Sequence, residues 1–180
     1  MLRAPPALAA LLLWALPAFG QANPPASVRV LDWMVAVPVG WTVRVPSSEM
    51  RVAQFSAASP SGTADIAVFF FGAAGGGSLE DNIQRWAAQF SGDDGKPVQP
   101  RVDKGKASGM PATRVALDGR YRRGVGSGSE TIQVPNQSLR VAVLETARGN
   151  LIFQLWGDRA AVATQEGRFA ALVQSLRAAP

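Results

Sequence analysis

Residues 64–92, ADIAVFFFGAAGGGSLEDNIQRWAAQFSG, decide the fold class of this chain. The first eight of them, 64–71, are almost continuously apolar, which predicts a central β-strand covered on both faces. Glycines follow, and then Ser78 with Asp81 three residues later, which is the pattern of a capped helix start. Apolar residues recur at spacings of three and four until Gly92, and they predict one amphipathic helix: Leu79, Ile83, Trp86, Ala87 and Phe90.

Segments with the composition and alternation of β-strands lie on both sides of this strand–helix unit. They are residues 28–37, 41–45 and 50–57 before it, and residues 98–106, 113–123, 139–146 and 151–156 after it. Residues 124–138 are rich in Gly and Ser and predict a loop. A second helix is predicted to begin at Asp158, with a buried stripe formed by Val162, Phe169, Leu172, Val173 and Leu176.

The order of these elements is strands, helix, strands, helix, which differs from a repeating βαβ pattern. It predicts an α+β fold: one domain with a mainly antiparallel sheet and two helices packed on it. The predicted domain spans residues 28–180 and follows a short tether at 23–27.

The N-terminus has the organisation of a secretory signal peptide. A positively charged start precedes an apolar run from Ala7 to Leu16, and Gly20-Gln21-Ala22 matches the small-x-small cleavage pattern. The run is about half the length that a membrane-spanning helix needs. We therefore expect residues 1–22 to be removed and the product to be exported, to the periplasm or the medium, without a transmembrane segment. An uncleaved N-terminal anchor is the alternative.

The basic residues of the predicted mature chain are concentrated in one window. Residues 23–180 hold 17 basic and 13 acidic residues, yet the segment from Lys96 to Arg123 alone holds eight basic and two acidic ones. Such one-sided charge indicates a docking surface for an acidic protein or an anionic envelope component, or simply a solvated strand face. The candidate docking residues are Lys104, Lys106, Arg114, Arg120 and Arg122. Nucleic acid is not an expected partner, because the charge is modest and no recognition motif is present.

The inventory of reactive side chains argues against an enzyme. The chain has no His and no Cys, which removes the usual nucleophilic triads, thiol chemistry and ordinary zinc sites. Two adjacent carboxylate pairs remain, but the pair at residues 80–81 fits a helix start and the pair at 93–94 fits a turn. We therefore predict no catalytic, cofactor-binding or metal-ligating residues and no cofactor.

Several motifs together resemble a known family. Pro38-Val39-Gly40-Trp41, the pattern Asn82-x-x-Arg85-Trp86-x-x-Gln89-Phe90 and the C-terminal Ser175-Leu176-Arg177 are similar to those of an uncharacterised family of exported bacterial proteins. The resemblance implies a PsbP/Mog1-like fold, an antiparallel sheet sandwiched by helices, across nearly the whole mature chain. Fold-group members with known roles are mostly non-catalytic: PsbP is an extrinsic photosystem subunit and Mog1 binds a small GTPase. The resemblance carries over no active-site residues, and a fold does not transfer a function.

Three function classes follow from these observations. The favoured one is a non-catalytic extracytoplasmic accessory protein that docks a partner through its sheet edge or basic strand face. The second is a small-ligand or lipid binder with a cavity between sheet and helix. The least favoured is a hydrolase built on carboxylates.

Overall fold

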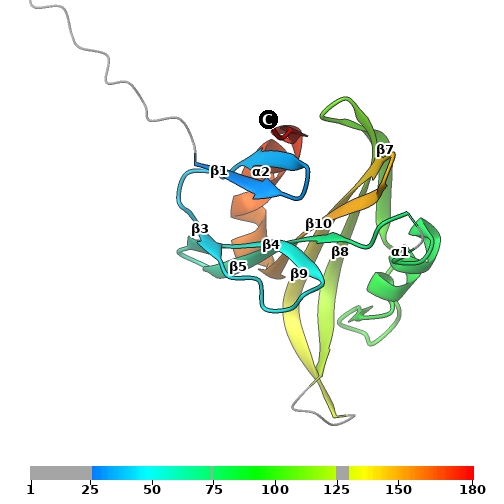
Figure 1. The fold of residues 1–180 in the computed structure, drawn as a ribbon. Coiled ribbons are helices and arrows are strands. Elements are labelled where there is room, and N and C mark those ends of the chain that lie inside the picture. Colours follow the sequence, from blue (N-terminus) through cyan, green and yellow to red (C-terminus); the bar gives the residue numbers. More distant parts are fainter. Residues whose placement is uncertain (1–25, 74, 125–129) are drawn as a thin grey trace, which may run out of the picture.

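The structure is a computed structural model that describes residues 26–73, 75–124 and 130–180 (Figure 1). The predicted signal peptide, residues 1–22, and most of the predicted tether lie outside the described residues. No helix in the described ranges combines the length and apolar character needed to cross a membrane.

The main sheet has eight strands, and all their pairings are antiparallel, as the α+β prediction requires. Along the sheet the strands are β3 (Trp41–Arg44), β4 (Arg51–Ser59), β5 (Gly62–Phe70), β10 (Gly149–Asp158), β9 (Thr131–Thr146), β8 (Met110–Gly124) and β6 (Phe90–Ser91), with β7 (Arg101–Ala107) also paired to β8. The predicted central strand is confirmed, because β5 lies between β4 and β10.

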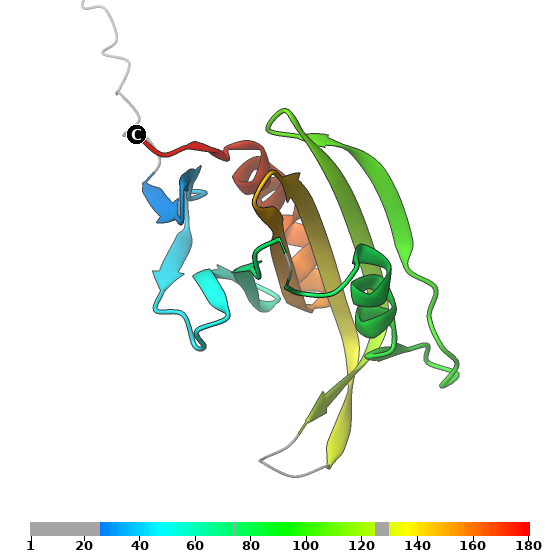
Figure 2. The ribbon, with the colours of Figure 1, turned by 45° about the vertical axis from the view of Figure 1, so that its right-hand side comes forward.

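The two predicted helices, α1 (Leu79–Ala87) and α2 (Arg159–Gln174), pack on opposite faces of this sheet (Figures 1 and 2). Trp86 is 4% exposed and Phe169 is 7% exposed, so both apolar stripes face the sheet as predicted. The first helix is shorter than predicted, because it ends at Ala87 and Phe90 lies in the strand β6. The predicted capping box at α1 is also present: the Asp81 amide donates to Ser78 Oγ over 3.0 Å, and the Ser78 amide donates to the Asp81 carboxylate.

Each face of the sheet has its own apolar cluster. The α2 cluster contains fully buried side chains such as Phe55, Phe153 and Leu172. The α1 cluster is smaller and centres on Trp86, with several half-buried rings at its margin. The two faces are therefore packed to different degrees.

The segment predicted as one strand over residues 28–37 is a hairpin instead. Leu31 has a φ of +56°, and the chain turns there between β1 (Ser27–Val30) and β2 (Trp33–Ala36). With β11 (Arg177–Ala178) these strands form a second, three-stranded sheet. The sequence hides the turn, because an apolar leucine occupies a left-handed position that usually favours glycine or asparagine.

The loop predicted over residues 124–138 is wrong for most of its length. β8 continues to Gly124 and β9 begins at Thr131, so the two strands form a long hairpin whose far end projects beyond the rest of the sheet (Figure 2). The register shifts opposite Gly119 and Tyr121, where Pro135 and Asn136 interrupt the regular β pattern of β9. Residues 125–129 of the predicted loop lie outside the described residues. We call the projecting part, Arg120–Gly124 with Thr131–Asn136, the arm.

Candidate functional site

The structure does not bring the five predicted docking residues to one face. Lys104 pairs with Thr113 and Lys106 with Pro111, whereas Arg114 is paired with Asp103. Residues paired in register share a face, and successive residues alternate between faces. The two lysines therefore lie on the α1 side of the sheet and Arg114 lies on the α2 side, which corrects the expectation of a single basic strand face.

Arg114 belongs to a region where the sheet is tied to α2. It lines a hollow of about 370 Å³ together with Arg101, Arg140 and Glu166. Its Nη2 donates to the backbone oxygen of Lys106 over 3.1 Å. Arg114 therefore lies where strands β7, β8 and β9 contact helix α2.

Arg140 is the centre of that junction, which we call the α2 clasp (Arg101, Asp118, Arg140 and Glu166). Its side chain is only 16% exposed; Nη1 lies 2.9 Å from Asp118 and Nε lies 2.7 Å from Glu166 on α2. Burial by itself raises the pKa of Asp118. Hydrogen bonds from Ser138 and Arg140, together with the nearby arginine charges, outweigh burial and hold the pKa of the Asp118 carboxyl below its ordinary value.

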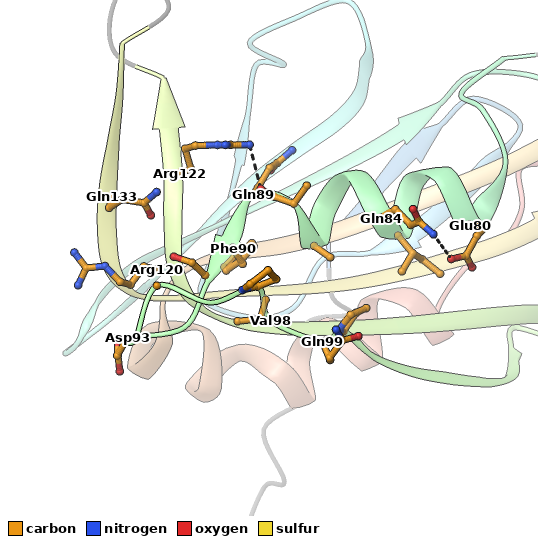
Figure 3. A pocket seen from close by; sticks show the side chains of 17 residues that line it. Glu80, Gln84, Gln89, Phe90, Asp93, Val98, Gln99, Arg120, Arg122 and Gln133 are labelled. Carbon is orange, nitrogen blue, oxygen red and sulfur yellow. Dashed lines mark hydrogen bonds between the residues drawn. The ribbon is translucent and has the colours of Figure 1, made fainter.

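Arg120 and Arg122 lie together at the arm, on the wall of a large hollow that we call the arm pocket (Figure 3). Its volume is about 710 Å³, and it lies between the end of α1, β6 and the turn that follows. Figure 3 shows Arg120, Arg122 and Gln133 at one end, with Glu80 and Gln84 at the other. Two of the five predicted docking residues, Arg120 and Arg122, therefore line the same hollow. Their docking role stays a prediction.

The arm pocket keeps its shape through contacts between β8 and the segment after α1. The amide of Arg122 donates to the Gln89 oxygen over 2.8 Å, and its Nη2 donates to the Ala88 oxygen over 3.1 Å. Gly119 permits this approach, because a Cβ there would come within 2.4 Å of the Ser91 oxygen. The remaining lining is rich in amides, which offer hydrogen bonds without charge: Gln84, Gln89, Gln99 and Gln133.

Comparison with known proteins shows which fold this chain has. No protein-family model and no curated protein matches the chain. The solution structure of cyanobacterial PsbP from Synechocystis sp. PCC 6803 matches with a TM-score of 0.53 and 12% identity, over 93% of this chain and 99% of that one. The chain has a PsbP-like fold. At this identity the likeness shows the fold alone.

Two further solved structures are similar to this chain. One is a protein of unknown function from Pseudomonas aeruginosa described as a putative regulator, with 17% identity, coverage of 88% of this chain and 99% of that one, and a TM-score of 0.49. The other is LpqN of Mycobacterium tuberculosis, described as involved in cell envelope biogenesis, with 12% identity, coverage of 89% and 88%, and a TM-score of 0.47.

Three of the four carboxylates in the two adjacent pairs of this chain have local structural roles. Asp81 belongs to the capping box of α1, and Glu80 accepts a hydrogen bond from Gln84 over 3.0 Å. Asp94 accepts the Lys96 amide in the turn, and this hydrogen bond is the main cause that lowers its pKa. Within the described ranges, no three carboxylates gather into a group that could hold a metal ion.

Sequence reasoning proposed a cavity between sheet and helix as its second function class, but it did not identify the residues of the concave site that lies on the α1 face. Two adjoining hollows of about 210 and 410 Å³ share Phe69, Trp86 and Gln154, and we call them together the aromatic groove. Arg51 and Trp156 line the smaller hollow. Its residues come from several separate elements, so no spacing along the chain could have predicted that they meet. Within the PsbP-like fold, the groove lies where the short helix α1 leaves part of the sheet uncovered.

Proposed function

We propose that this protein is an exported, non-catalytic accessory protein that binds an acidic segment of a partner protein at the arm and the arm pocket. The observation that carries the proposal is the projection of an arginine-bearing hairpin beyond its sheet, beside a hollow large enough for a peptide segment. Loops and edges that project from a rigid scaffold are common sites of recognition.

The charge of the arm fits an acidic partner. Arg122 and Arg123 are exposed and Arg120 is half-buried. Among the ion pairs found between described residues, none includes these three arginines. Apart from the Arg122 Nη2, which donates to the Ala88 oxygen, their guanidinium nitrogens are therefore available to carboxylates of a partner, to which arginine binds in a two-pronged geometry.

The backbone of the arm offers a second means of binding. Residues Thr131–Val134 of β9 pair with β8 on one side, whereas β10 joins the other side of β9 only from Gln137 onward. In the part of the sheet that the structure describes, this stretch is therefore a free strand edge. A partner segment can add to such an edge as an extra strand through main-chain hydrogen bonds.

Export and the absence of catalysis belong to the same proposal. The N-terminal pattern supports export, and the lack of His and Cys supports a binding role rather than an enzymatic one. The resemblance to a family of exported proteins points the same way.

Site-specific photocrosslinking in the native cell envelope tests the proposal. A photoreactive residue at Gln133, in the arm pocket, should trap the partner, while one at the exposed Arg168 of α2 should not. Trapping should weaken as salt rises, because screening shortens below about 8 Å above physiological ionic strength. The protein recovered from this envelope preparation should begin close to residue 23.

A charge reversal separates docking from stability. Arg120→Glu with Arg122→Glu should abolish trapping and change the free energy of unfolding by about 1 kcal/mol or less. The matched control, Arg159→Glu with Arg168→Glu, makes the same change in net charge on exposed residues of α2 and should leave trapping intact. Adducts that persist in the arm variant, or that disappear equally in the control, would overturn the docking role.

A further inference from the structure

The aromatic groove is walled by rings contributed by both the sheet and α1. Phe69 and Trp156 come from neighbouring strands, Trp86 comes from α1 and Tyr121 comes from β8. The smaller hollow holds about 210 Å³, roughly the volume of seven waters, and the adjoining hollow holds about 410 Å³. Mostly apolar walls with a few polar groups are the usual composition of a small-molecule site.

The charged residues of the groove all have the same sign. Arg51 lines the smaller hollow and Arg85 lines the larger one, and the remaining lining residues are aromatic, aliphatic, amide, hydroxyl or glycine. Asp65, which lies beside Trp156 in the strand register, is not among them. A ligand that enters this groove therefore meets positive charge among aromatic rings and uncharged amides, which favours an anion over a cation.

Arg51 is held in place but has hydrogen-bonding capacity to spare. Its guanidinium carbon lies 5.4 Å from the Trp156 ring centre and 5.8 Å from the Phe69 ring centre. The hydrogen bonds that its side chain makes with described residues all use Nη1, to Ser47 Oγ at 2.8 Å and Gln54 Oε1 at 3.0 Å. Nη2 and Nε can thus donate to a ligand while the contacts with the two rings hold the guanidinium group in place.

From this geometry we propose that the aromatic groove binds a small aromatic carboxylate, with the carboxylate on Arg51 and the ring among Trp86, Tyr121 and Trp156. The two free nitrogens of Arg51 match the two oxygens of a carboxylate. A flat ring suits walls that are themselves aromatic, because offset and edge-to-face ring contacts stabilise beyond the area that they bury. Gln89, Gln137 and Gln154 supply amides for polar substituents on the ligand.

Calorimetric titration with 2-naphthoate tests this site. We expect one molecule bound per chain, at least about tenfold more tightly than 2-naphthamide, which has the same ring without the charge. Acetate, which has the charge without the ring, should not bind measurably. The indole NMR signals of Trp86 and Trp156 should shift on addition of 2-naphthoate, and that of Trp33, which lies in the small sheet, should not.

Two arginine variants test whether Arg51 is the side chain that binds the carboxylate of the ligand. Arg51→Gln should reduce the affinity for 2-naphthoate about tenfold or more and leave that for 2-naphthamide unchanged. Arg44→Gln is the matched control, since Arg44 neighbours Gln54 on the next strand and donates to Ser56 over 3.0 Å without lining the groove. This control should bind 2-naphthoate as the parent protein does.

The proposal fails if 2-naphthoate does not bind, or if both naphthalenes bind equally well. It also fails if Arg51→Gln binds 2-naphthoate with full affinity at an unchanged melting temperature. None of these outcomes affects docking at the arm, because Arg120 and Arg122 do not line the groove.

Discussion

The two faces of the main sheet are covered by helices of unequal length. Helix α2 has 16 residues, and beneath it side chains such as Phe153 and Leu172 are completely buried. Helix α1 has nine residues, and only Trp86 and Ile83 of its apolar side chains are buried. Phe69, Phe71 and Trp156 on its side of the sheet stay half-buried.

The two faces therefore differ in packing and in the hollows that they carry. The α2 face combines dense apolar packing with the α2 clasp, so its residues hold the strands and the helix together. On the α1 face, the aromatic groove lies beside rings of the sheet that the short helix leaves half-buried, and the arm pocket lies beyond the end of this helix. The α2 face carries the hollow that Arg114 and Glu166 line.

The largest expected effect is the removal of the one large side chain that anchors α1. Trp86→Ala should cost about 3–5 kcal/mol of unfolding free energy, because the ring is buried and leaves a cavity. Urea denaturation measures this loss. Trp156→Ala, at a half-buried ring of the same face, should cost less. A loss below about 1 kcal/mol for Trp86→Ala would show that the α1 face has no core of its own.

The second effect concerns the α2 clasp. Asp118→Asn should cost about 2 kcal/mol at neutral pH, since it removes the negative partner of Arg140. The folded protein holds the pKa of Asp118 below the unfolded value of about 3.9, so this stabilisation is present above that pH and declines as the pH falls further. The stability difference between the parent protein and the variant should therefore shrink below about pH 4. A difference that is constant from pH 7 to pH 3 would contradict the assignment.

The smallest expected effect is that of an arginine substitution in the half-buried part of the α1 face. Burial raises the pKa of Asp65, and the charges of Arg51 and Arg44 partly oppose this. Arg51→Gln should thus raise the Asp65 pKa further, and it should cost only about 1 kcal/mol through the lost ring contacts. NMR titration of the Asp65 carboxyl measures the shift. The control Arg101→Gln, at the α2 clasp, should leave the pKa of Asp65 unchanged. An equal shift of this pKa in both variants would contradict the proximity of Arg51 to Asp65.

Much of the fold was predictable because its signals are local. The apolar run that became β5 needs only neighbouring residues to be recognised, and so does the capping box of Ser78 and Asp81. The β9 part of the arm was missed because the Gly- and Ser-rich sequence before it and Pro135 within it resemble a loop, although the alternating residues from Thr131 to Val134 continue the strand pattern. Two residues of the arm pocket, Arg120 and Arg122, were found through charge alone.

The sequence alone predicted the α+β class, the central strand and both helices, because periodicity and capping are properties of single segments. Only the tertiary structure decided which side chains share a surface. The register of β7 on β8 separates Lys104 and Lys106 from Arg114, although all three belong to one basic window. Strand pairing also brings Arg51 beside Trp156, which is 105 positions further along the chain. Such neighbours depend on strand order and register between distant segments, and these are set when the whole core packs together.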